Sequence, residues 1–447
     1  MSETTAAGAP ANPAEEEAYP PPALAWAMVA VLFLAYILSF IDRMIIGLLV
    51  EPLKADLGLS DTQVSLLQGF AFALFYTIVG LPIGRMIDRS ARLPIIAGGV
   101  ALWSFMTAVC GMATQYWHLF LARMGVGVGE ATLSPAAYSI IPDLFPKRRL
   151  GLAMGIYGLG SAAGAGLAFL IGAAVIRLIS ESGSVTLPIL GELRAWQATF
   201  FIVGLPGLLV AGLIMLMPEP VRRGASAPGG RDIASISAVI EFTFRKAGSV
   251  LGLCFAVAMV NFAVFAAVSW LPVLLIRVHG FDLSGAGNLA GGALILGGLI
   301  GLVGGGALTD RIGGGLPQGR LAFCGFAAIV GTVFAVIFPL VSSPWMAAAA
   351  FVIFFASAAV PIGAAASALQ QLTPNRMRAT VSAIYLFIVN LIGLGAGPTA
   401  TALVGDTFFP GGDGIRYAIA WVSPFAFAIA ALLFFLSARY AAREQVH

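Results

Sequence analysis

The chain has 447 residues, of which 59% are hydrophobic and 10% are charged, and its formal net charge is +3. Soluble domains carry about 25% charged residues, so this composition and a mean hydropathy of +0.95 exclude a soluble globular protein. We predict a polytopic membrane protein without a nucleic-acid partner.

Cysteine and histidine are rare and scattered along the chain. Each occurs three times, too dispersed for a disulfide framework or for metal-ligand spacing. These residues are Cys110, Cys254, Cys324, His118, His279 and His447. The sequence also lacks a glycine-rich phosphate loop followed by Lys-Ser or Lys-Thr. We therefore predict no metal, no cofactor and no catalytic residues.

Residues 1–22 are acidic and proline-rich, which predicts a disordered N-terminal tail. Beyond them, apolar stretches of about 20 residues predict twelve membrane-spanning helices. In chain order they are 24–50, 63–83, 94–113, 116–141, 150–176, 196–217, 248–275, 284–308, 321–341, 344–369, 379–404 and 416–437. The predicted fold is all-α, with six-helix bundles at 23–217 and 248–438, a linker at 218–247 and a tail at 439–447.

The basic residues predict the orientation of these spans. With the N-terminus inside, 17 of the 24 Lys and Arg residues fall in inner loops, the linker and the tail, and only five fall in outer loops. Inner loops of membrane proteins carry the excess of Lys and Arg. Both termini are therefore predicted to be cytoplasmic, in the inner membrane if the source is bacterial.

The linker contains a pattern of its own. After the flexible run 224–230, Ile233, Ile236, Ile240 and Phe244 recur at helical spacing. This spacing predicts a short amphipathic helix on the inner leaflet. A solvated linker without such a helix is the alternative.

The two bundles contain matching segments. Gly84-Arg-Met-Ile-Asp88-Arg89 closes span two, and Gly306-Ala-Leu-Thr-Asp310-Arg311 closes span eight, 222 residues further on. Duplicated six-helix halves with a site between them are typical of secondary transporters.

The first copy, Gly84-x-x-x-Asp88-Arg89-x-x-Arg92, resembles the signature loop of the major facilitator superfamily, with departures at Ala91 and Leu93. The resemblance covers nearly the whole chain and implies that spans one, four, seven and ten line a central cavity. It also implies that this loop gates the transporter by pinning the cytoplasmic helix ends. The residues given this role are Gly84, Asp88, Arg89, Arg92, Arg148, Arg149, Asp310 and Arg311. Topogenic positive charge is the plainer alternative.

Three segments resemble the spinster family of lysolipid and sphingosine-phosphate transporters within that superfamily. They are Ser39-Phe-Ile-Asp42-Arg43, the run from Asp56 to Gln63, and Arg123-x-Gly125-x-Gly-x-Gly129-Glu130.

Four ionisable residues remain inside the predicted spans: Asp42 and Arg43 in span one, and Arg123 and Glu130 in span four. Each costs about 2.5–3.5 kcal/mol at a helix centre, so a functional site is the default hypothesis. Sequence neighbours point about 100° apart on a helix, so Asp42 and Arg43 are not expected to pair with each other. A static buried network is the alternative.

The chemistry of these side chains suggests a role for each. Arg43 stays cationic and can hold a phosphate or carboxylate, with Tyr36 two turns away on the same face. Glu130, and Asp42 as a second candidate, can take up a proton when desolvated. Arg123 is either a ligand contact or a structural, snorkelling arginine.

The second half offers only neutral polar groups, with Asn261 as the candidate for substrate binding and Gln370 and Asn390 as weaker ones. This asymmetry predicts a monomeric, proton-coupled transporter of an amphipathic organic anion, such as a lysophospholipid or a sphingoid phosphate. Its partners are then the substrate, protons and the bilayer. A proton symporter for a small carboxylate is the alternative, and a lipid-acting membrane enzyme is disfavoured because the histidines stand alone.

Overall fold

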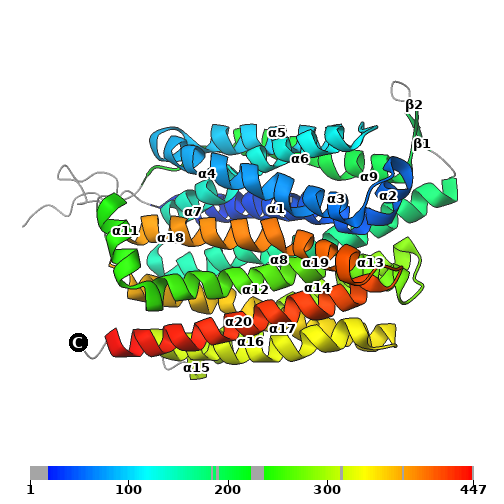
Figure 1. Cartoon of the computed structure of the whole chain (residues 1–447). Helices are drawn as coiled ribbons and strands as arrows, with labels where there is room; N and C mark the ends of the chain where they lie inside the picture. Colours follow the sequence, from blue (N-terminus) through cyan, green and yellow to red (C-terminus); the bar gives the residue numbers. More distant parts are fainter. Residues whose placement is uncertain are drawn as a thin grey trace, which may run out of the picture.

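The computed structural model describes residues 19–182, 185–187, 191–222, 236–312, 316–374 and 377–444. Its helices run roughly along one direction and form two groups (Figure 1). The first group contains α1 (Pro22–Leu48), α2 (Val50–Leu57), α3 (Asp61–Ser65), η1 (Leu66–Phe70), α4 (Ala71–Arg89), α5 (Arg92–Cys110), α6 (Tyr116–Glu130), α7 (Leu133–Leu144), α8 (Lys147–Ser182), α9 (Ala195–Gly204) and α10 (Pro206–Met215). Strands β1 (Val185–Leu187) and β2 (Gly191–Leu193) lie between α8 and α9.

The second group follows the linker. It contains α11 (Ile236–Arg245), η2 (Ala247–Leu251), α12 (Gly252–Val268), α13 (Leu271–Arg277), α14 (Leu283–Leu299), η3 (Ile300–Gly304), α15 (Gly305–Ile312), α16 (Pro317–Leu340), α17 (Pro344–Leu372), α18 (Arg378–Val389), η5 (Asn390–Leu394), α19 (Gly395–Phe408) and α20 (Gly414–Glu444). The π-helical turns η1, η3 and η5 each join two α-helices, and η2 leads into α12.

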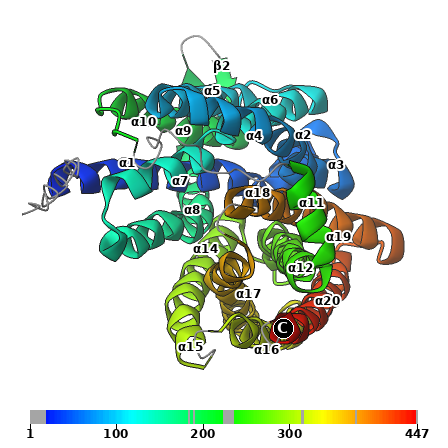
Figure 2. The ribbon, with the colours of Figure 1, turned by 90° about the vertical axis from the view of Figure 1, so that its left-hand side faces the viewer.

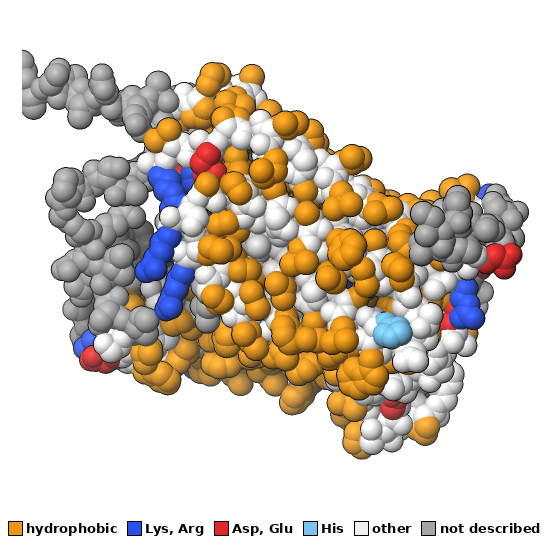
Figure 3. All heavy atoms as spheres, turned by 90° about the horizontal axis from the view of Figure 1, so that it is seen from above, with side chains coloured by type: hydrophobic (Ala, Val, Ile, Leu, Met, Phe, Trp, Pro, Cys, Tyr) orange, Lys and Arg blue, Asp and Glu red, His pale blue; other side chains and the backbone are white. Residues whose placement is uncertain are grey.

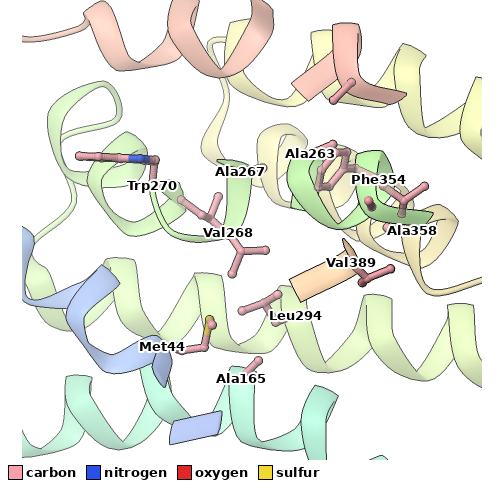
Figure 4. Packing of buried hydrophobic residues seen from close by; sticks show 14 of the residues in the cluster. Met44, Ala165, Ala263, Ala267, Val268, Trp270, Leu294, Phe354, Ala358 and Val389 are labelled. Atoms are coloured by element: carbon pink, nitrogen blue, oxygen red, sulfur yellow. The ribbon is translucent and has the colours of Figure 1, made fainter. Parts of the chain in front are cut away.

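The two groups pack side by side, with α8 and α14 in contact where they meet (Figure 2). We call the end that holds α11 and the C-terminus the linker end, and the end that holds β1 and β2 the hairpin end; they lie at the left and right of Figure 1. Met44 and Ala165 of the first half approach Leu294 of the second in an apolar seam (Figure 4).

Eleven helices of the described chain are long and apolar enough to cross a membrane. They confirm eleven of the predicted spans. The predicted span at 116–141 is divided into α6 and α7, which end and begin on either side of Ala131 and Thr132. Pro135 explains the break, because it has no N–H to donate to the carbonyl of Ala131. Glu130 is consequently the last residue of α6.

The all-α prediction omits one feature, the β1–β2 hairpin. The strands are antiparallel, with Val185 opposite Leu193 and Leu187 opposite Gly191. They occupy the loop between the fifth and sixth spans, where the sequence shows no apolar run long enough to signal an element. The helical and membrane-spanning character of the chain is unaffected.

A close helix contact places α6 against α5. A Cβ atom on Gly129 would lie 2.7 Å from the carbonyl oxygen of Gly99 and 2.7 Å from the backbone nitrogen of Trp103. Only glycine allows this approach, as the small-residue pair Gly125 and Gly129 predicts. The contact fixes the end of α6, where Glu130 lies, against α5.

The surface divides as expected for a membrane protein. Hydrophobic side chains cover the middle of the face in Figure 3, and Lys and Arg side chains gather near the linker end. Helix α11 lies in the segment that predicts an amphipathic helix, with Ile240 and Phe244 exposed. The cytoplasmic location of the linker end and the contact of α11 with the leaflet stay predictions.

Candidate functional site

The four ionisable residues predicted inside the spans are all buried. They lie on α1 and α6, where Asp42, Arg43, Arg123 and Glu130 are between 0% and 8% exposed. Charges are buried at such cost only when they are paired or hydrogen-bonded. Their partners therefore define what the group can do.

Arg43 and Glu130 form a buried ion pair. Arg43 Nη2 lies 2.5 Å from Glu130 Oε2, and the Ser39 hydroxyl donates to the same oxygen at 2.6 Å. The carboxyl oxygen Oε1 of Glu130 has no hydrogen-bond partner within the described residues. Glu130 thus holds Arg43 through one oxygen and keeps the other available for a proton.

Aromatic rings surround the guanidinium of Arg43. Its central carbon lies 4.7 Å from the ring centre of Phe40, 4.5 Å from that of Phe72 and 5.6 Å from that of Tyr76. Desolvated cation–π contacts of this kind contribute about 2 kcal/mol each. They hold the guanidinium of Arg43 in place beside Glu130.

Asp42 points to a different helix from Arg43, as the 100° spacing predicts. Its carboxylate accepts from the Thr107 hydroxyl of α5 at 3.0 Å, while its backbone carbonyl accepts from Arg123 Nη1 at 3.0 Å. Arg123 is 0% exposed, so it does not snorkel. Its hydrogen bond to the backbone of α1 fixes α1 against α6, and its guanidinium also lies 5.8 Å from the ring centre of Phe72.

The other predicted binding residues have distinct surroundings. Tyr36 is half-buried and stacks on Tyr157. Asn261 donates its amide to the Val257 carbonyl of its own helix, α12, at 3.1 Å. Gln370 donates to Ser382 at 2.8 Å and so links α17 with α18. The structure thus brings Tyr36 into the first-half site and gives Asn261 and Gln370 partners within the second half.

Among the predicted gating residues, Arg92 is the first residue of α5 and is completely buried. Its guanidinium contacts Asp143 of α7 and donates to Glu219 at 2.9 Å and to the Ser139 carbonyl at 3.1 Å. Glu219 also accepts from the backbone N–H groups of Arg92 and Leu93, which caps α5. Arg92 is therefore a fixed point within the first half.

The contacts of Glu219 lower the pKa of its carboxyl group. Burial alone raises the pKa of its carboxyl, but the backbone N–H of Leu93 and the guanidinium of Arg92 outweigh burial, so the pKa lies below its usual value. These contacts thus favour the ionised form of Glu219 in the folded protein.

The other predicted gating residues that the structure describes lie in open or exposed positions. Gly84 lies in α4 with open space where a Cβ would be. Arg89, Arg149 and Arg311 are exposed. The side chains of Asp88, Arg148 and Asp310 lie outside the described part of the structure.

At the hairpin end, ion pairs join the two halves. Arg277 of α13 donates to Glu51 of α2 at 2.7 Å and to both carboxylate oxygens of Asp61 at 2.6 and 2.8 Å. Lys54 also contacts Asp61. The sequence analysis missed this cluster because its residues come from different halves of the chain. The available signal was that Lys54 and Arg277 are among the few basic residues predicted to lie in outer loops.

Further polar contacts join the halves near the same end. The Thr62 hydroxyl donates to Asp406 of α19 at 2.7 Å, and Gln68 donates to the Ser269 carbonyl at 3.3 Å. These contacts and the ion pairs of Arg277 hold the two halves together at the hairpin end.

Two helical halves that bury acids and arginines in the membrane define a transporter. The profile of the Major Facilitator Superfamily matches residues 32–398, and the chain belongs to this superfamily, whose members are transporters rather than enzymes. It is a polytopic integral membrane protein.

Several relatives are similar over most of their length. The chain is 28% identical to an MFS-type efflux pump of Mycolicibacterium smegmatis over 86% of each chain. It is 25% identical to a probable L-galactonate transporter of Escherichia coli, over 84% of this chain and 82% of that one. The sphingosine-1-phosphate transporter SPNS2 of Danio rerio is 25% identical, over 83% of this chain and 74% of that one.

The fold also matches that of a solved structure. The crystal structure of a bacterial homolog of the human lysosomal transporter spinster, in an inward-facing and unoccupied conformation, matches with a TM-score of 0.78 and 28% identity. The match covers 95% of this chain and 99% of that chain. The resemblance to spinster proteins predicted from the sequence is confirmed.

Proposed function

We propose that this protein couples proton movement to the transport of an organic anion by alternating access. The observation that carries the proposal is the buried pair of Arg43 and Glu130. In one state the ionised Glu130 neutralises Arg43. In the other, a proton neutralises Glu130 and Arg43 takes an anionic substrate in its place.

The coupling follows from competition for one cation. Arginine remains protonated at any reachable pH and holds carboxylates and phosphates through several donors. A proton on Glu130 therefore favours anion binding, and a bound anion favours the proton. Each pH unit of gradient supplies about 1.4 kcal/mol per proton, enough for tenfold accumulation.

The neighbouring residues have supporting roles in this proposal. Asp42 is a second proton site, held by Thr107. Arg123 positions the backbone of Asp42, and the aromatic rings around Arg43 keep the guanidinium in place during exchange. The ion pairs of Arg277 at the hairpin end close one side of the transporter and must separate for substrate to enter there.

An amphipathic anion is the favoured substrate class, because the charges lie in the first half while the second half presents neutral and apolar side chains. Similarity to a sphingosine-1-phosphate transporter is consistent with it. Similarity to a probable L-galactonate transporter favours the second candidate, a small organic carboxylate carried with a proton.

Transport in proteoliposomes tests the coupling. Glu130→Gln keeps the hydrogen bonds from Ser39 and Arg43 but cannot ionise, so it should abolish accumulation driven by a pH gradient and spare exchange of substrate. Arg43→Ala should abolish both accumulation and exchange. The assay uses a panel of lysolipids and organic acids with imposed pH gradients.

Two surface substitutions serve as matched controls. Glu192→Gln and Arg439→Ala remove the same charges at exposed positions and should transport like the parent. Accumulation by Glu130→Gln and Arg43→Ala at the parent level would overturn the coupling mechanism.

A further inference from the structure

Tyrosine is concentrated beside the buried ion pair. Tyr36 of α1, Tyr76 of α4, Tyr138 of α7 and Tyr157 of α8 each come from a different helix of the first half. The rings of Tyr36 and Tyr157 stack with centroids 4.5 Å apart, and Tyr138 meets Tyr157 edge-on at 5.8 Å. We call these four residues the tyrosine cluster.

The cluster adjoins the anion site on the side of α7. The guanidinium of Arg43 lies 5.6 Å from the ring centre of Tyr76. Ser134 and Tyr138 lie on α7, which begins at Leu133, shortly after Glu130 ends α6. The cluster thus adjoins the ion pair through Tyr76 and follows Glu130 along the chain.

The hydroxyl of Tyr157 faces Ser134, whose Oγ lies 3.4 Å away. A hydrogen bond between two hydroxyl groups is usually about 2.5–3.0 Å long. The longer contact therefore leaves the Tyr157 hydroxyl able to bond to another molecule.

One member of the cluster is exposed: Tyr138 is 42% accessible. Phenylalanine would supply the same stacked rings without the cost of polar groups inside a membrane protein. The hydroxyls therefore require an explanation other than packing.

We propose that the tyrosine cluster binds hydroxyl groups of the transported anion, so that the substrate is a hydroxylated anion whose charge lies on Arg43. This inference rests on the proposed function and makes its substrate class narrower. A phenol both donates and accepts, and its ring face packs against the C–H groups that accompany hydroxyls. The same chemistry is found in a lysolipid headgroup and in a sugar acid.

Matched pairs of probes test this binding. One pair is lauroyl lysophosphatidic acid, with a free hydroxyl, and dodecyl phosphate, without one; the other is galactonate and hexanoate. Binding is measured by titration calorimetry on the full chain in nanodiscs. The parent should bind the hydroxylated member of at least one pair roughly tenfold more tightly, as expected for hydroxyls that meet buried partners.

Removing two hydroxyls of the cluster should weaken that preference. In Tyr36→Phe combined with Tyr138→Phe we expect it to fall to about twofold, with the affinity for the hydroxyl-free probe unchanged. Tyr116→Phe removes a hydroxyl outside the cluster and should retain the tenfold preference. The pair that shows the effect distinguishes the lipid source from the sugar source.

The outcomes separate this inference from the proposed function. An equal loss for both members of a pair, an unchanged preference in the double variant, or no preference in the parent overturns the hydroxyl site. Binding of the hydroxyl-free probes that survives Arg43→Ala overturns the anion site instead. Each result thus identifies which proposal fails.

Discussion

The two halves of the molecule share a framework but differ in the charges they bury. Arg92 bonds to Ser139 in the first half, and Arg320 bonds to Ser367 in the second. Both pairs are separated by 47 residues and join the start of one span to the end of the next. The duplicated sequence has therefore preserved one contact in each half.

The site chemistry belongs to one half alone. Asp42, Arg43, Arg123 and Glu130 all lie in the first half, with Arg43 and Glu130 paired inside it. In the second half Asn261 is bonded to its own helix. The difference indicates that the common framework serves packing, while the proposed exchange of a proton and an anion would depend on the charged residues of the first half.

The largest effect is expected from breaking the buried ion pairs of Arg92 in the first half. Arg92→Ala leaves the carboxylate of Asp143 without its guanidinium partner in a buried position, which costs about 3 to 5 kcal/mol. The melting temperature of the purified protein in detergent should fall by several degrees. Arg89→Ala, an exposed neighbour, should melt like the parent.

The partner Glu219 adds a pH dependence to the same test. Its pKa is lowered in the folded protein, so its contribution to stability is present above its ordinary pKa and is lost as the pH falls through the folded value. Glu219→Gln should lower the melting temperature at pH 7, and the difference from the parent should disappear in acid. A difference that persists in acid would exclude this cause.

An intermediate effect is expected where the halves meet. Arg277→Gln removes the ion pairs with Glu51 and Asp61, and a loss of about 1.4 kcal/mol would shift the balance towards opening at the hairpin end by tenfold. Spin labels attached at Ala55→Cys and Gly412→Cys report the separation of the halves by double electron–electron resonance. In Arg277→Gln the distribution of distances between the labels should gain a longer component.

The matching control is an ion pair confined to one half. Arg194 lies 2.9 Å from Asp56, and both belong to the first half. Arg194→Gln should leave the label distances as in the parent. Equal shifts in both variants would show that the pairs of Arg277 have no special part in closing the hairpin end.

The smallest effect is expected in the second half. Asn261→Ala removes an amide that donates to the Val257 carbonyl of its own helix. Transport rates in proteoliposomes should change by less than about twofold, because that contact contributes only about 1 kcal/mol to folding. A loss as severe as that expected of Arg43→Ala would place a substrate contact in the second half and break the comparison.

The spans could be predicted from the sequence because hydropathy is local, and each apolar run identifies its own helix. The separation of Asp42 from Arg43 could be predicted from helix geometry alone. The partners Thr107 and Ser39 could not, because they depend on which helices touch. Neither could the pairing of Arg277 with Asp61, whose residues are 216 positions apart.

Two errors of detail have simple causes. Arg92 was placed in a loop because the predicted third span begins only at residue 94, whereas it is the first residue of α5, where Asp143 and Glu219 neutralise it. The fourth span was predicted to be continuous because hydropathy does not register a missing hydrogen bond. Pro135 was the signal for that break.

The break between α6 and α7 has a mechanical consequence. An unbroken helix is stiff because each turn is tied to the next, and bends concentrate where a proline removes such a tie. In this protein the weakest point of the span directly follows Glu130. A change of charge on Glu130 would therefore act beside the point where the span bends most easily, just before the segment that carries Ser134 and Tyr138.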